Sequence, residues 1–554
     1  MSRFIKIYCV NTLSYIKIEG GDSLASILKQ IGPLPFNPIC ARVNNRTEAL
    51  SFQVFMPKQI EFLPPEHPSS KRVYTRSLCM MLYKAVSLTH PGTSLRIEHS
   101  VSRGHYCRLH DENDPQRTIT PNVPALKEAM NSLVERNLPF ERHEKLTGDV
   151  IEIFKKQRLD SKVSLLNTTH ELYTTYYTLD GLADSYYGPL APKTGNLKVF
   201  DLQTYEEGML LLPPGHNPKE AATPVPQQKM FAAFTDNLRF NRIIGVSNAG
   251  ELNMAIEQKR SSMLINLAET LHANELSRIA DAIVKKGAKV VLLAGPSSSG
   301  KTTTCKRLSI HLMANLLTPK MISLDDYFVD RHTTPKDPVT GDYDYESLYA
   351  LDLPLLNRQL NALLAGEEVN LPTYSFELGT RIDKKRTMRL NPGDILLLEG
   401  IHGLNPGLTP YVPAESIFKV YVSALTALSI DDHNWIPTTD TRLLRRLVRD
   451  HKYRHTSALE TLQRWESVRR GEEKWIFPFQ ENADATFNSS LLFEPAVLKE
   501  YAEPLLKSVP HDAEQYSEAH RLLKFLSYFE PLPDGQIPGT SLLREFLGGS
   551  SFHY

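Results

Sequence analysis

The apolar residues of the chain form two kinds of pattern, short continuous runs and repeats at helical spacing. Continuous runs at 290–294 and 395–398 have the length of buried strands. Helical segments separate the strand-like runs, and this alternation predicts an α/β domain over residues 289–500. Such an order favours a parallel sheet with helices on both faces, since right-handed crossovers place helices there.

The segments outside this domain carry other patterns. The N-terminal region alternates strand-like pieces with a short helix at 24–31, and the Asp22-Ser23 pair supplies its N-cap. Proline-containing stretches at 212–226 mark a boundary, and apolar residues at helical spacing fill 252–271 and 276–284. The sequence therefore predicts a multidomain α/β and α+β protein. Five parts are expected. They are a small domain of strands and one helix at 1–62, an α+β domain at 63–225, a helical connector at 226–288, the α/β domain at 289–500 and a helical C-terminal extension at 501–554.

Length and charge limit the class of protein. A chain of 554 residues is too long for a single core. Lys+Arg and Asp+Glu both number 63, which argues against a generally basic surface that coats nucleic acid but leaves room for a local basic face. The five cysteines are scattered without a C-x-x-C pair, as in a protein of a reducing compartment. The N-terminus lacks a signal-peptide apolar core and the apolar runs are of strand length, so we expect a cytoplasmic protein with no membrane partner.

The strand at 290–294 runs directly into the pattern Gly295-x-x-x-x-Gly300-Lys301-Thr302, the spacing of a phosphate-binding loop. Glycines let backbone N–H groups approach a polyphosphate, and the positive end of the following helix attracts it. Lys301 would neutralise the β- and γ-phosphates of ATP, and the Thr302 hydroxyl would hold Mg²⁺. The alternative, a Gly/Ser turn without ligand, fits the flanking strand and helix less well. The predicted loop residues for ATP are Gly295, Pro296, Ser297, Ser298, Ser299, Gly300, Lys301, Thr302 and Thr303.

Carboxylates follow two further predicted strands. Asp325 and Asp326 end the run that begins at Met321, and Glu399 ends the run that begins at Asp394. The carboxyl ends of parallel strands meet at the ligand-binding edge of an open sheet. We therefore expect Asp325 and Glu399 beside the phosphate loop, where they would join Thr302 as Mg²⁺ ligands.

A predicted helix at 440–450 carries arginines on one face and leucines on another. The simplest interpretation is a solvated cationic face. Beside a phosphate loop, a lid that delivers guanidinium groups to the transferring phosphoryl is the better one, because bidentate Arg fits its equatorial oxygens. The predicted lid residues are Arg442 and Arg445 in catalysis, and Arg449 and Arg454 in ATP binding.

Five motifs recur together in one known group of kinases: Asp325-Asp326-Tyr327-Phe328, 342–349, Pro372-Thr-Tyr374-Ser-Phe376, Glu399-Gly400-Ile401 and 440–450. Through them, residues 289–490 resemble the uridine kinase and phosphoribulokinase group of P-loop kinases, and uridine–cytidine kinase in particular. The resemblance implies that Asp325 is the general base, that Asp344 grips ribose hydroxyls, and that Tyr374 and Phe376 wall the base, with Tyr349 nearby. Two positions depart from the family, since its base-reading histidine falls at Gly379 and Asp326 replaces a serine. These departures leave the base specificity open.

The N-terminal half carries two weaker resemblances. The strand order of residues 1–62 resembles the TGS domain, a β-grasp module. Residues 63–225 resemble the editing domain of threonyl-tRNA synthetase through the segments at 96–108 and 184–202. Four ligand-type side chains converge on the family's pocket, and the matching positions here are Arg76, Met80, Tyr186 and Leu190. Because none of these replaces imidazole or thiolate, we expect a retained fold with a degenerate site.

These observations predict an ATP- and Mg²⁺-dependent kinase that phosphorylates the 5′-hydroxyl of a ribonucleoside. Two alternatives stay open. One is a kinase for another sugar or sugar phosphate, as in phosphoribulokinase. The other is an RNA-associated regulatory protein in which the N-terminal half contacts RNA or tRNA. The accepted base and the oligomeric state, with a homo-oligomer among the options, are also open at this stage.

Overall fold

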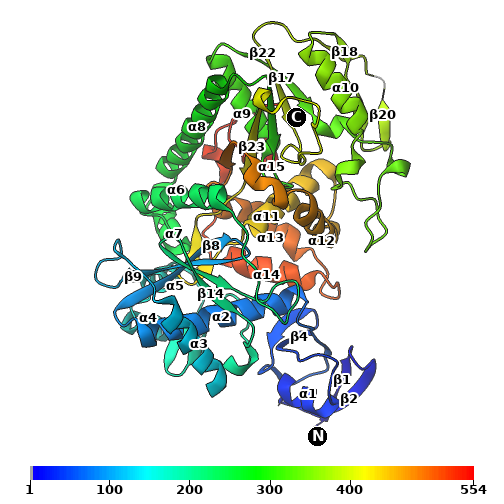
Figure 1. The fold of residues 1–554 in the computed structure, drawn as a ribbon. Helices are drawn as coiled ribbons and strands as arrows, with labels where there is room; N and C mark the ends of the chain where they lie inside the picture. Colours follow the sequence, from blue (N-terminus) through cyan, green and yellow to red (C-terminus); the bar gives the residue numbers. More distant parts are fainter. Residues whose placement is uncertain (1–3, 383, 554) are drawn as a thin grey trace.

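The computed structural model describes residues 4–382 and 384–553 (Figure 1). The N-terminal sheet lies at one end of the molecule and the sheet that carries the phosphate loop lies toward the other end. Among the residues so described, no helix combines the length and the apolar character needed to cross a membrane.

The N-terminal part is a mixed five-stranded sheet in the order β2-β1-β7-β4-β5 with one helix packed against it. The helix α1 spans Leu24–Ile31 as predicted, and Ser23 caps it by accepting from the Ser26 N–H at 3.2 Å. The sequence patterns missed β5 and β7, since each of these strands is only four residues long. The strands are β1 (Phe4–Cys9), β2 (Ser14–Glu19), β3 (Asp22–Ser23), β4 (Cys40–Val43), β5 (Arg46–Ala49), β6 (Gln53–Val54) and β7 (Gln59–Phe62).

The second part contains a long buried helix between two sheets. This helix, α2, spans Pro68–Thr89, and every residue from Arg76 to Val86 is buried. One sheet has the order β10-β9-β15-β14 with β8 paired to β9, and the other has the order β11-β12-β13. The remaining elements are β8 (Thr93–Val101), β9 (Gly104–Asp111), β10 (Thr118–Ile119), α3 (Val123–Arg136), β11 (Glu141–Leu146), α4 (Thr147–Lys156), α5 (Asp160–Thr168), β12 (Tyr173–Leu179), β13 (Leu182–Asp184), β14 (Asp201–Tyr205) and β15 (Gly208–Leu212).

Three helices occupy the predicted connector: α6 (Gln228–Ile244), α7 (Ala249–Glu257) and α8 (Ser261–Lys286). These helices also contribute to the hydrophobic core. Leu276, Ile279 and Ile283 of α8 are buried in the same hydrophobic cluster as Val291 of the following strand. Helix α8 is therefore part of the core around the C-terminal sheet.

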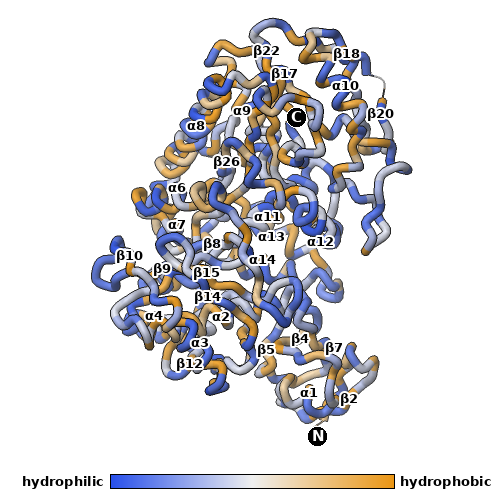
Figure 2. Tube along the Cα trace, in the orientation of Figure 1, coloured by the Kyte–Doolittle hydropathy of each residue, from blue (hydrophilic) through white to orange (hydrophobic). Residues whose placement is uncertain are grey.

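The C-terminal sheet is entirely parallel, with the order β17-β22-β16-β23-β26. This confirms the predicted parallel sheet. Alternate residues of β16 point to opposite faces: Val291 and Leu293 join the cluster under α8 and α9, and Val290 and Leu292 join the one under α10. Figure 2 shows these central strands as hydrophobic segments. The elements here are β16 (Val290–Ala294), α9 (Lys301–Ala314), β17 (Thr318–Ser323), α10 (Leu353–Leu364), β18 (Val369–Asn370), β19 (Thr373–Ser375), β20 (Thr380–Ile382), β21 (Thr387–Met388), β22 (Asp394–Glu399), β23 (Ile417–Ser423), β24 (Ser429–Asp431), β25 (Asn434–Trp435), α11 (Thr438–Arg454), α12 (Ala458–Trp475) and β26 (Ala485–Asn488).

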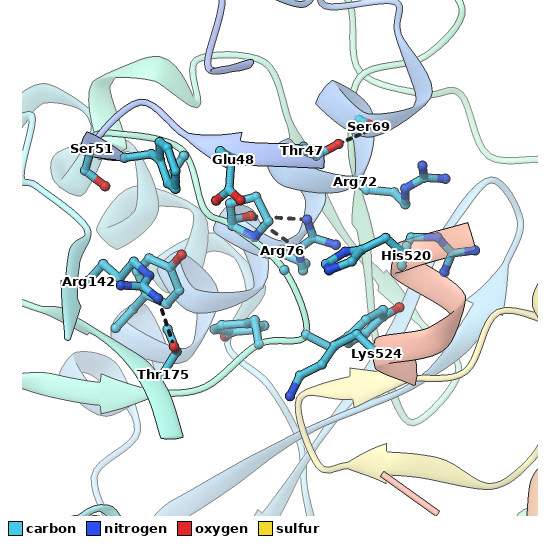
Figure 3. A pocket seen from close by; sticks show the side chains of 18 of the residues that line it. Thr47, Glu48, Ser51, Ser69, Arg72, Arg76, Arg142, Thr175, His520 and Lys524 are labelled. Atoms are coloured by element: carbon cyan, nitrogen blue, oxygen red, sulfur yellow. Dashed lines mark hydrogen bonds between the residues drawn. The ribbon is translucent and has the colours of Figure 1, made fainter. Parts of the chain in front are cut away.

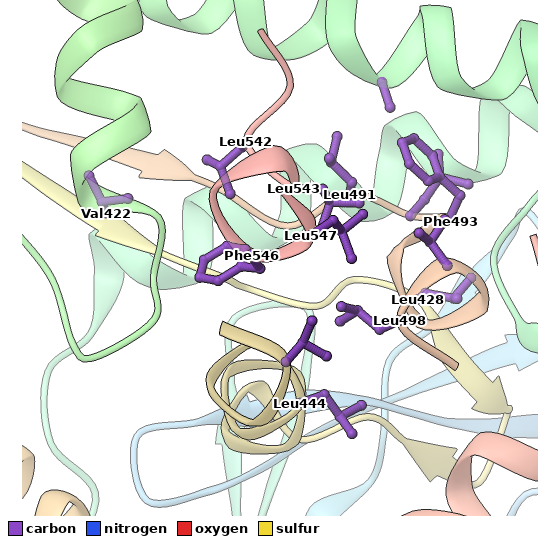
Figure 4. Close-up of a cluster of buried hydrophobic side chains, with 14 of the residues drawn as sticks. Val422, Leu428, Leu444, Leu491, Phe493, Leu498, Leu542, Leu543, Phe546 and Leu547 are labelled. Atoms are coloured by element: carbon purple, nitrogen blue, oxygen red, sulfur yellow. The ribbon is translucent and has the colours of Figure 1, made fainter. Parts of the chain in front are cut away.

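The last residues fold back onto this sheet instead of extending away from it. Helix α13 (Glu494–Lys507) crosses the boundary expected after residue 500, and α14 (Tyr516–Ser527) and α15 (Arg544–Leu547) follow. The side chains of Leu542, Leu543 and Phe546 are fully buried in the cluster that also holds Val422 (Figure 4). The segment predicted as a helical extension contains helices, and its apolar residues complete the core of the α/β domain.

Candidate active site

The phosphate loop follows β16, which lies between β22 and β23 in the sheet. A Cβ at Gly295 would lie 2.0 Å from the Val422 carbonyl oxygen, so this position has no room for a side chain. Gly300 has a φ of 84°, a conformation that favours glycine, and α9 begins at the next residue, Lys301. The local geometry is that of a strand–loop–helix phosphate site with the helix N-terminus at the loop.

Helix α11 and the residue after β26 hold the phosphate loop in place through its carbonyl groups. Arg442 donates to the Ser297 carbonyl oxygen at 3.1 Å and Arg445 to that of Ser298 at 3.4 Å. The Ser489 hydroxyl donates to the Ser299 carbonyl oxygen at 2.5 Å. Because three successive carbonyl groups are held on this side, the conformation of the loop is set by side chains far away in sequence.

Arg442 and Arg445 do not form the exposed lid that we expected. Their side chains are about 1% and 0% exposed, and each forms a two-pronged ion pair, Arg442 with Glu472 and Arg445 with Glu494. Both carboxylates are themselves fully buried. The physical reason is that a guanidinium buried against the sheet requires a carboxylate partner. These two arginines brace the loop.

Other arginines of α11 face the site. Arg449 pairs with Asp450 at 2.7 Å, and the largely exposed Arg454 approaches the same carboxylate at 3.6 Å. The charges of both lie close enough to Asp325 to oppose the rise in its pKa. Arg446, which the sequence reasoning passed over, donates to the Ser297 hydroxyl at 2.9 Å. The spacing along one helix face suggested Arg442 as a lid residue. Only the packing of α11 decides which arginines are buried in ion pairs behind the loop and which face the site.

Two acidic side chains lie at the carboxyl edge of the sheet next to the loop. Glu399 ends β22, the neighbour of β16, and Asp325 follows β17, one strand further out. Desolvation raises the pKa of Asp325, while the Lys301 ammonium opposes this rise. Burial and the nearby Asp325 charge raise the pKa of Glu399 to about 7. Lys301, whose Nζ donates to the Pro296 carbonyl oxygen at 3.1 Å, thus lies near both.

This pair fits a divalent cation. Two carboxylates that repel each other at a desolvated position beside a phosphate loop are stabilised by a metal ion. Within residues 4–382 and 384–553, no group of three or more His, Cys, Asp or Glu side chains is arranged to hold an ion. Thr302, Asp325 and Glu399 are the residues that would hold Mg²⁺ together with a bound nucleotide.

Asp326 has a different role from its neighbour. It accepts from Arg386 at 2.9 Å and from the Tyr374 N–H at 3.4 Å, so it ties β19 to the end of β17. Tyr374 and Phe376 have ring centroids 5.1 Å apart, and both lie within 6 Å of the Phe328 ring. Phe376 is exposed and Tyr374 is buried behind it. Tyr349 lies apart from this cluster, against Trp475 at 5.8 Å.

Asp344 lies in the loop before α10, and its carboxylate accepts from the Glu346 N–H at 3.1 Å. Burial raises the pKa of Asp344. Glu346, which the sequence reasoning missed, has its pKa raised to about 7 by burial and by Glu472, and the Lys301 charge acts in the opposite direction. The Glu346 carboxylate therefore lies close enough to Glu472 and Lys301 for their charges to act on its pKa.

A carboxylate from the C-terminus also reaches the loop. Glu545 of α15 accepts from the backbone N–H of Thr303 at 3.1 Å and from its hydroxyl at 2.6 Å. Leu542, in the same segment, packs against Gly300. No sequence pattern indicated this contact, because the two residues are 242 positions apart.

Gly379, the position of the family histidine, has a φ of 71° and lies against Arg331. A Cβ at Gly379 would meet the Arg331 guanidinium at 2.6 Å, and the Arg331 backbone N–H donates to the Gly379 carbonyl oxygen at 2.8 Å. A side chain at 379 would therefore displace Arg331. The Arg331 guanidinium lies at this position and donates to the carbonyl oxygens of Phe376 and Glu377.

Residues 290–491 match the model of the phosphoribulokinase / uridine kinase family. A uridine kinase of Lactobacillus helveticus is 33% identical over 202 residues, which are 35% of this chain and 83% of that protein. The chain belongs to this family. A uridine kinase of Staphylococcus epidermidis is 30% identical over 198 residues (35% of this chain and 84% of that protein). One of Deinococcus deserti is 29% identical over 210 residues (38% and 91%). The family domain of this chain is thus an ATP-dependent kinase, and the N-terminal half lies outside the matched region.

Proposed function

We propose that the kinase domain phosphorylates the 5′-hydroxyl of a ribonucleoside, with ATP as donor. The observation that carries the proposal is the meeting of Lys301, Asp325 and Glu399 at the carboxyl edge of the parallel sheet. An aromatic wall formed by Phe328, Tyr374 and Phe376 lies beside them. The relatives named as uridine kinases support a base-bearing substrate.

Each residue would contribute a distinct step. Asp325 would accept the proton of the attacking hydroxyl, since its carboxylate has no hydrogen-bond partner among the described residues and its raised pKa makes it a better base than an ordinary aspartate. Lys301 would neutralise charge on the transferred phosphoryl group, and Arg449 and Arg454 would add to this from α11. Asp344 would hold the ribose hydroxyls. Bound Mg²⁺ would supply further charge neutralisation at Thr302, Asp325 and Glu399.

A second candidate is a kinase for another sugar or a sugar phosphate. The replacement of the base-reading histidine by Gly379, with Arg331 packed against it, favours this alternative. A guanidinium at this wall suits a substrate with an anionic or strongly accepting group.

A substrate panel separates the two. The full-length protein is incubated with ATP and Mg²⁺ and with uridine, cytidine, 2′-deoxyuridine, adenosine, ribose or ribulose 5-phosphate, and the phosphorylated product is measured. We expect uridine or cytidine to give the highest kcat/KM. We also expect 2′-deoxyuridine to be poorer by about tenfold or more, because Asp344 would lose a hydrogen-bond donor. Turnover of ribulose 5-phosphate without turnover of any nucleoside would overturn the proposal in favour of the second candidate.

A further inference from the structure

A cavity of about 690 Å³ lies far from the phosphate loop in sequence, where three parts of the chain meet. Strand β5 and the loop after it form one wall, α2 with β11, β12 and the loop at 186–189 forms another, and α14 forms the third (Figure 3). Thr47 donates or accepts a hydrogen bond with Ser517 at 2.8 Å, which holds the first and third walls together. The cavity is therefore a fixed feature of the fold.

Arg76 is directed into this cavity from α2 (Figure 3). It is 7% exposed, and its Nε and Nη2 donate to the Pro189 carbonyl oxygen at 3.4 and 3.2 Å. Among the described residues no carboxylate forms an ion pair with it. Burial lowers the pKa of Arg76 to about 10, so it remains charged at neutral pH. A buried cation without a carboxylate partner is costly unless an anion binds there.

The other cations of the cavity have carboxylate partners. Arg72 pairs with Glu518 at 2.9 Å, Lys524 with Glu171 at 2.6 Å and Arg142 with Glu144 at 3.1 Å. Arg521 pairs with Asp440 and Glu518, both at 2.6 Å. These pairs leave the charge of Arg76 as an excess.

Glu48 also lines the cavity and forms no ion pair within the described part of the chain. Its pKa is raised to about 7 by burial, so it neutralises the excess only in part. The cavity therefore presents a net positive charge to a ligand.

The walls around Arg76 are aromatic. Tyr177, Tyr186 and Tyr187 line the cavity, and the Arg76 guanidinium lies 5.7 Å from the Tyr187 ring centroid. The volume exceeds that of an inorganic phosphate several times, so a ligand that fills it has an organic part. Flat aromatic walls favour a ring in that part.

We propose that this cavity binds a small organic phosphate of nucleoside monophosphate size, with the phosphate on Arg76 and the ring against the tyrosines. Arginine forms the two parallel hydrogen bonds that a phosphate accepts, and Lys524 and His520 lie along the same wall. This binding site is separate from the kinase site and stands whether or not the acceptor of the kinase is a nucleoside.

The cavity is physically connected to the phosphate loop. Arg521 of α14 donates to both oxygens of Asp440, in the first turn of α11, at 2.6 and 2.9 Å. On the same helix, Arg442 donates to the Ser297 carbonyl oxygen of the loop at 3.1 Å. A ligand in the cavity that moves α14 would therefore change the conformation of the phosphate loop. The apparent KM for ATP would report this change.

The test is equilibrium dialysis of labelled UMP against the full-length protein, with a non-hydrolysable ATP analogue and excess uridine present to fill the kinase site. Inorganic phosphate serves as the competitor. We expect the wild-type protein to bind UMP despite the excess of uridine, and inorganic phosphate to compete with UMP. Arg76→Gln should bind at least about tenfold more weakly, and Arg76→Lys should lie between, since it keeps the charge but loses the bidentate geometry.

Lys507→Gln is the matched control, because Lys507 is an exposed lysine of an ion pair outside the cavity. If circular dichroism shows that Arg76→Gln does not fold, Lys524→Gln, at a partly exposed position, replaces it with an expected loss of severalfold. Equal UMP affinity in the wild-type protein and the folded cavity variants would overturn the proposal. Arg76-dependent binding of a short single-stranded RNA without binding of UMP or phosphate would overturn it in favour of a nucleic-acid site.

Discussion

At the scale of single residues, the two neighbouring aspartates after β17 do different work. Asp326 is held by Arg386 and the Tyr374 N–H, whereas the Asp325 carboxylate has no hydrogen-bond or ion-pair partner among the described residues and lies within reach of the Lys301 charge. Only Asp325 is therefore free to receive a proton. Asp326 instead orients the aromatic wall through its hydrogen bond with the Tyr374 N–H.

Asp325→Asn and Lys301→Ala are expected to abolish phosphorylation by different routes. Asp325→Asn should leave ATP binding largely intact and lower kcat by about two to four decades, because a general base is lost. Lys301→Ala should weaken ATP binding and turnover together. Calorimetric titration with an ATP analogue and steady-state kinetics distinguish the two. Near wild-type turnover in Asp325→Asn would remove this residue from the mechanism.

Glu399 is expected to destabilise the nucleotide-free protein at neutral pH. Its pKa rises from 4.5 to about 7 on folding, so the folded state binds the proton more tightly. The stability that this proton gives is present below pH 4.5 and is lost as the pH rises through about 7. Glu399→Gln should therefore raise the free energy of unfolding by about 1–3 kcal/mol at pH 8 and by little at pH 4.

Denaturant unfolding at the two pH values checks this. The same variant should lose the Mg²⁺ dependence of ATP binding. A stabilisation that is equal at both pH values would show that the carboxylate charge is not its cause.

At the scale of elements, α11 carries two kinds of arginine, those that brace the phosphate loop and those that face Asp325. Arg442→Ala leaves Glu472 buried without its partner and should cost about 3–5 kcal/mol of stability. Arg449→Ala should change stability by less than about 1 kcal/mol and lower kcat by about two decades, because Arg449 faces Asp325. Thermal unfolding and kinetics of both variants test the assignment. If Arg442→Ala were as stable as the wild-type protein but had a lower kcat, Arg442 would be a catalytic lid residue and not a brace.

The short helix α15 places a carboxylate at the N-terminus of α9, where a nucleotide phosphate would bind. Because Glu545 accepts from the Thr303 N–H and hydroxyl, it competes with phosphate oxygens for the same donors. Glu545→Gln should tighten ATP binding by about three- to tenfold. Glu503→Gln, which alters an exposed pair on α13, is the control and should leave the affinity unchanged. Unchanged ATP affinity in Glu545→Gln would show that the contact does not compete with nucleotide.

At the scale of the whole molecule, the N-terminal half and the kinase domain share a buried ionic cluster. Lys162 lies 2.9 Å from both Asp184 and Asp431, and His433 lies 2.8 Å from Asp184. All four side chains are at most 3% exposed. Since Asp431 and His433 belong to the kinase domain, neither half buries these charges satisfactorily alone.

Lys162→Ala is therefore expected to cost about 3–5 kcal/mol, as two buried carboxylates lose their cation. Lys155→Ala removes an exposed lysine from an ion pair in the same region and should change stability by less than about 0.5 kcal/mol. Urea unfolding measures both. Equal effects would mean that the cluster does not couple the halves.

The sequence by itself determined the elements of the site that depend on local chain geometry. The strand, the glycines and the helix of the phosphate loop are contiguous, and Asp325 and Glu399 end apolar strands whose carboxyl ends share one edge. Periodicity and the order of elements suffice for such features.

Tertiary structure alone decided the rest. Whether Arg442 is a free lid residue or a buried brace depends on Glu472, and the contact of Glu545 with Thr303 joins residues 242 positions apart. The cavity around Arg76 exists only because three distant segments pack together. No local pattern encodes these pairings, since each is fixed by desolvation and by the charge partners that the packing of distant segments supplies.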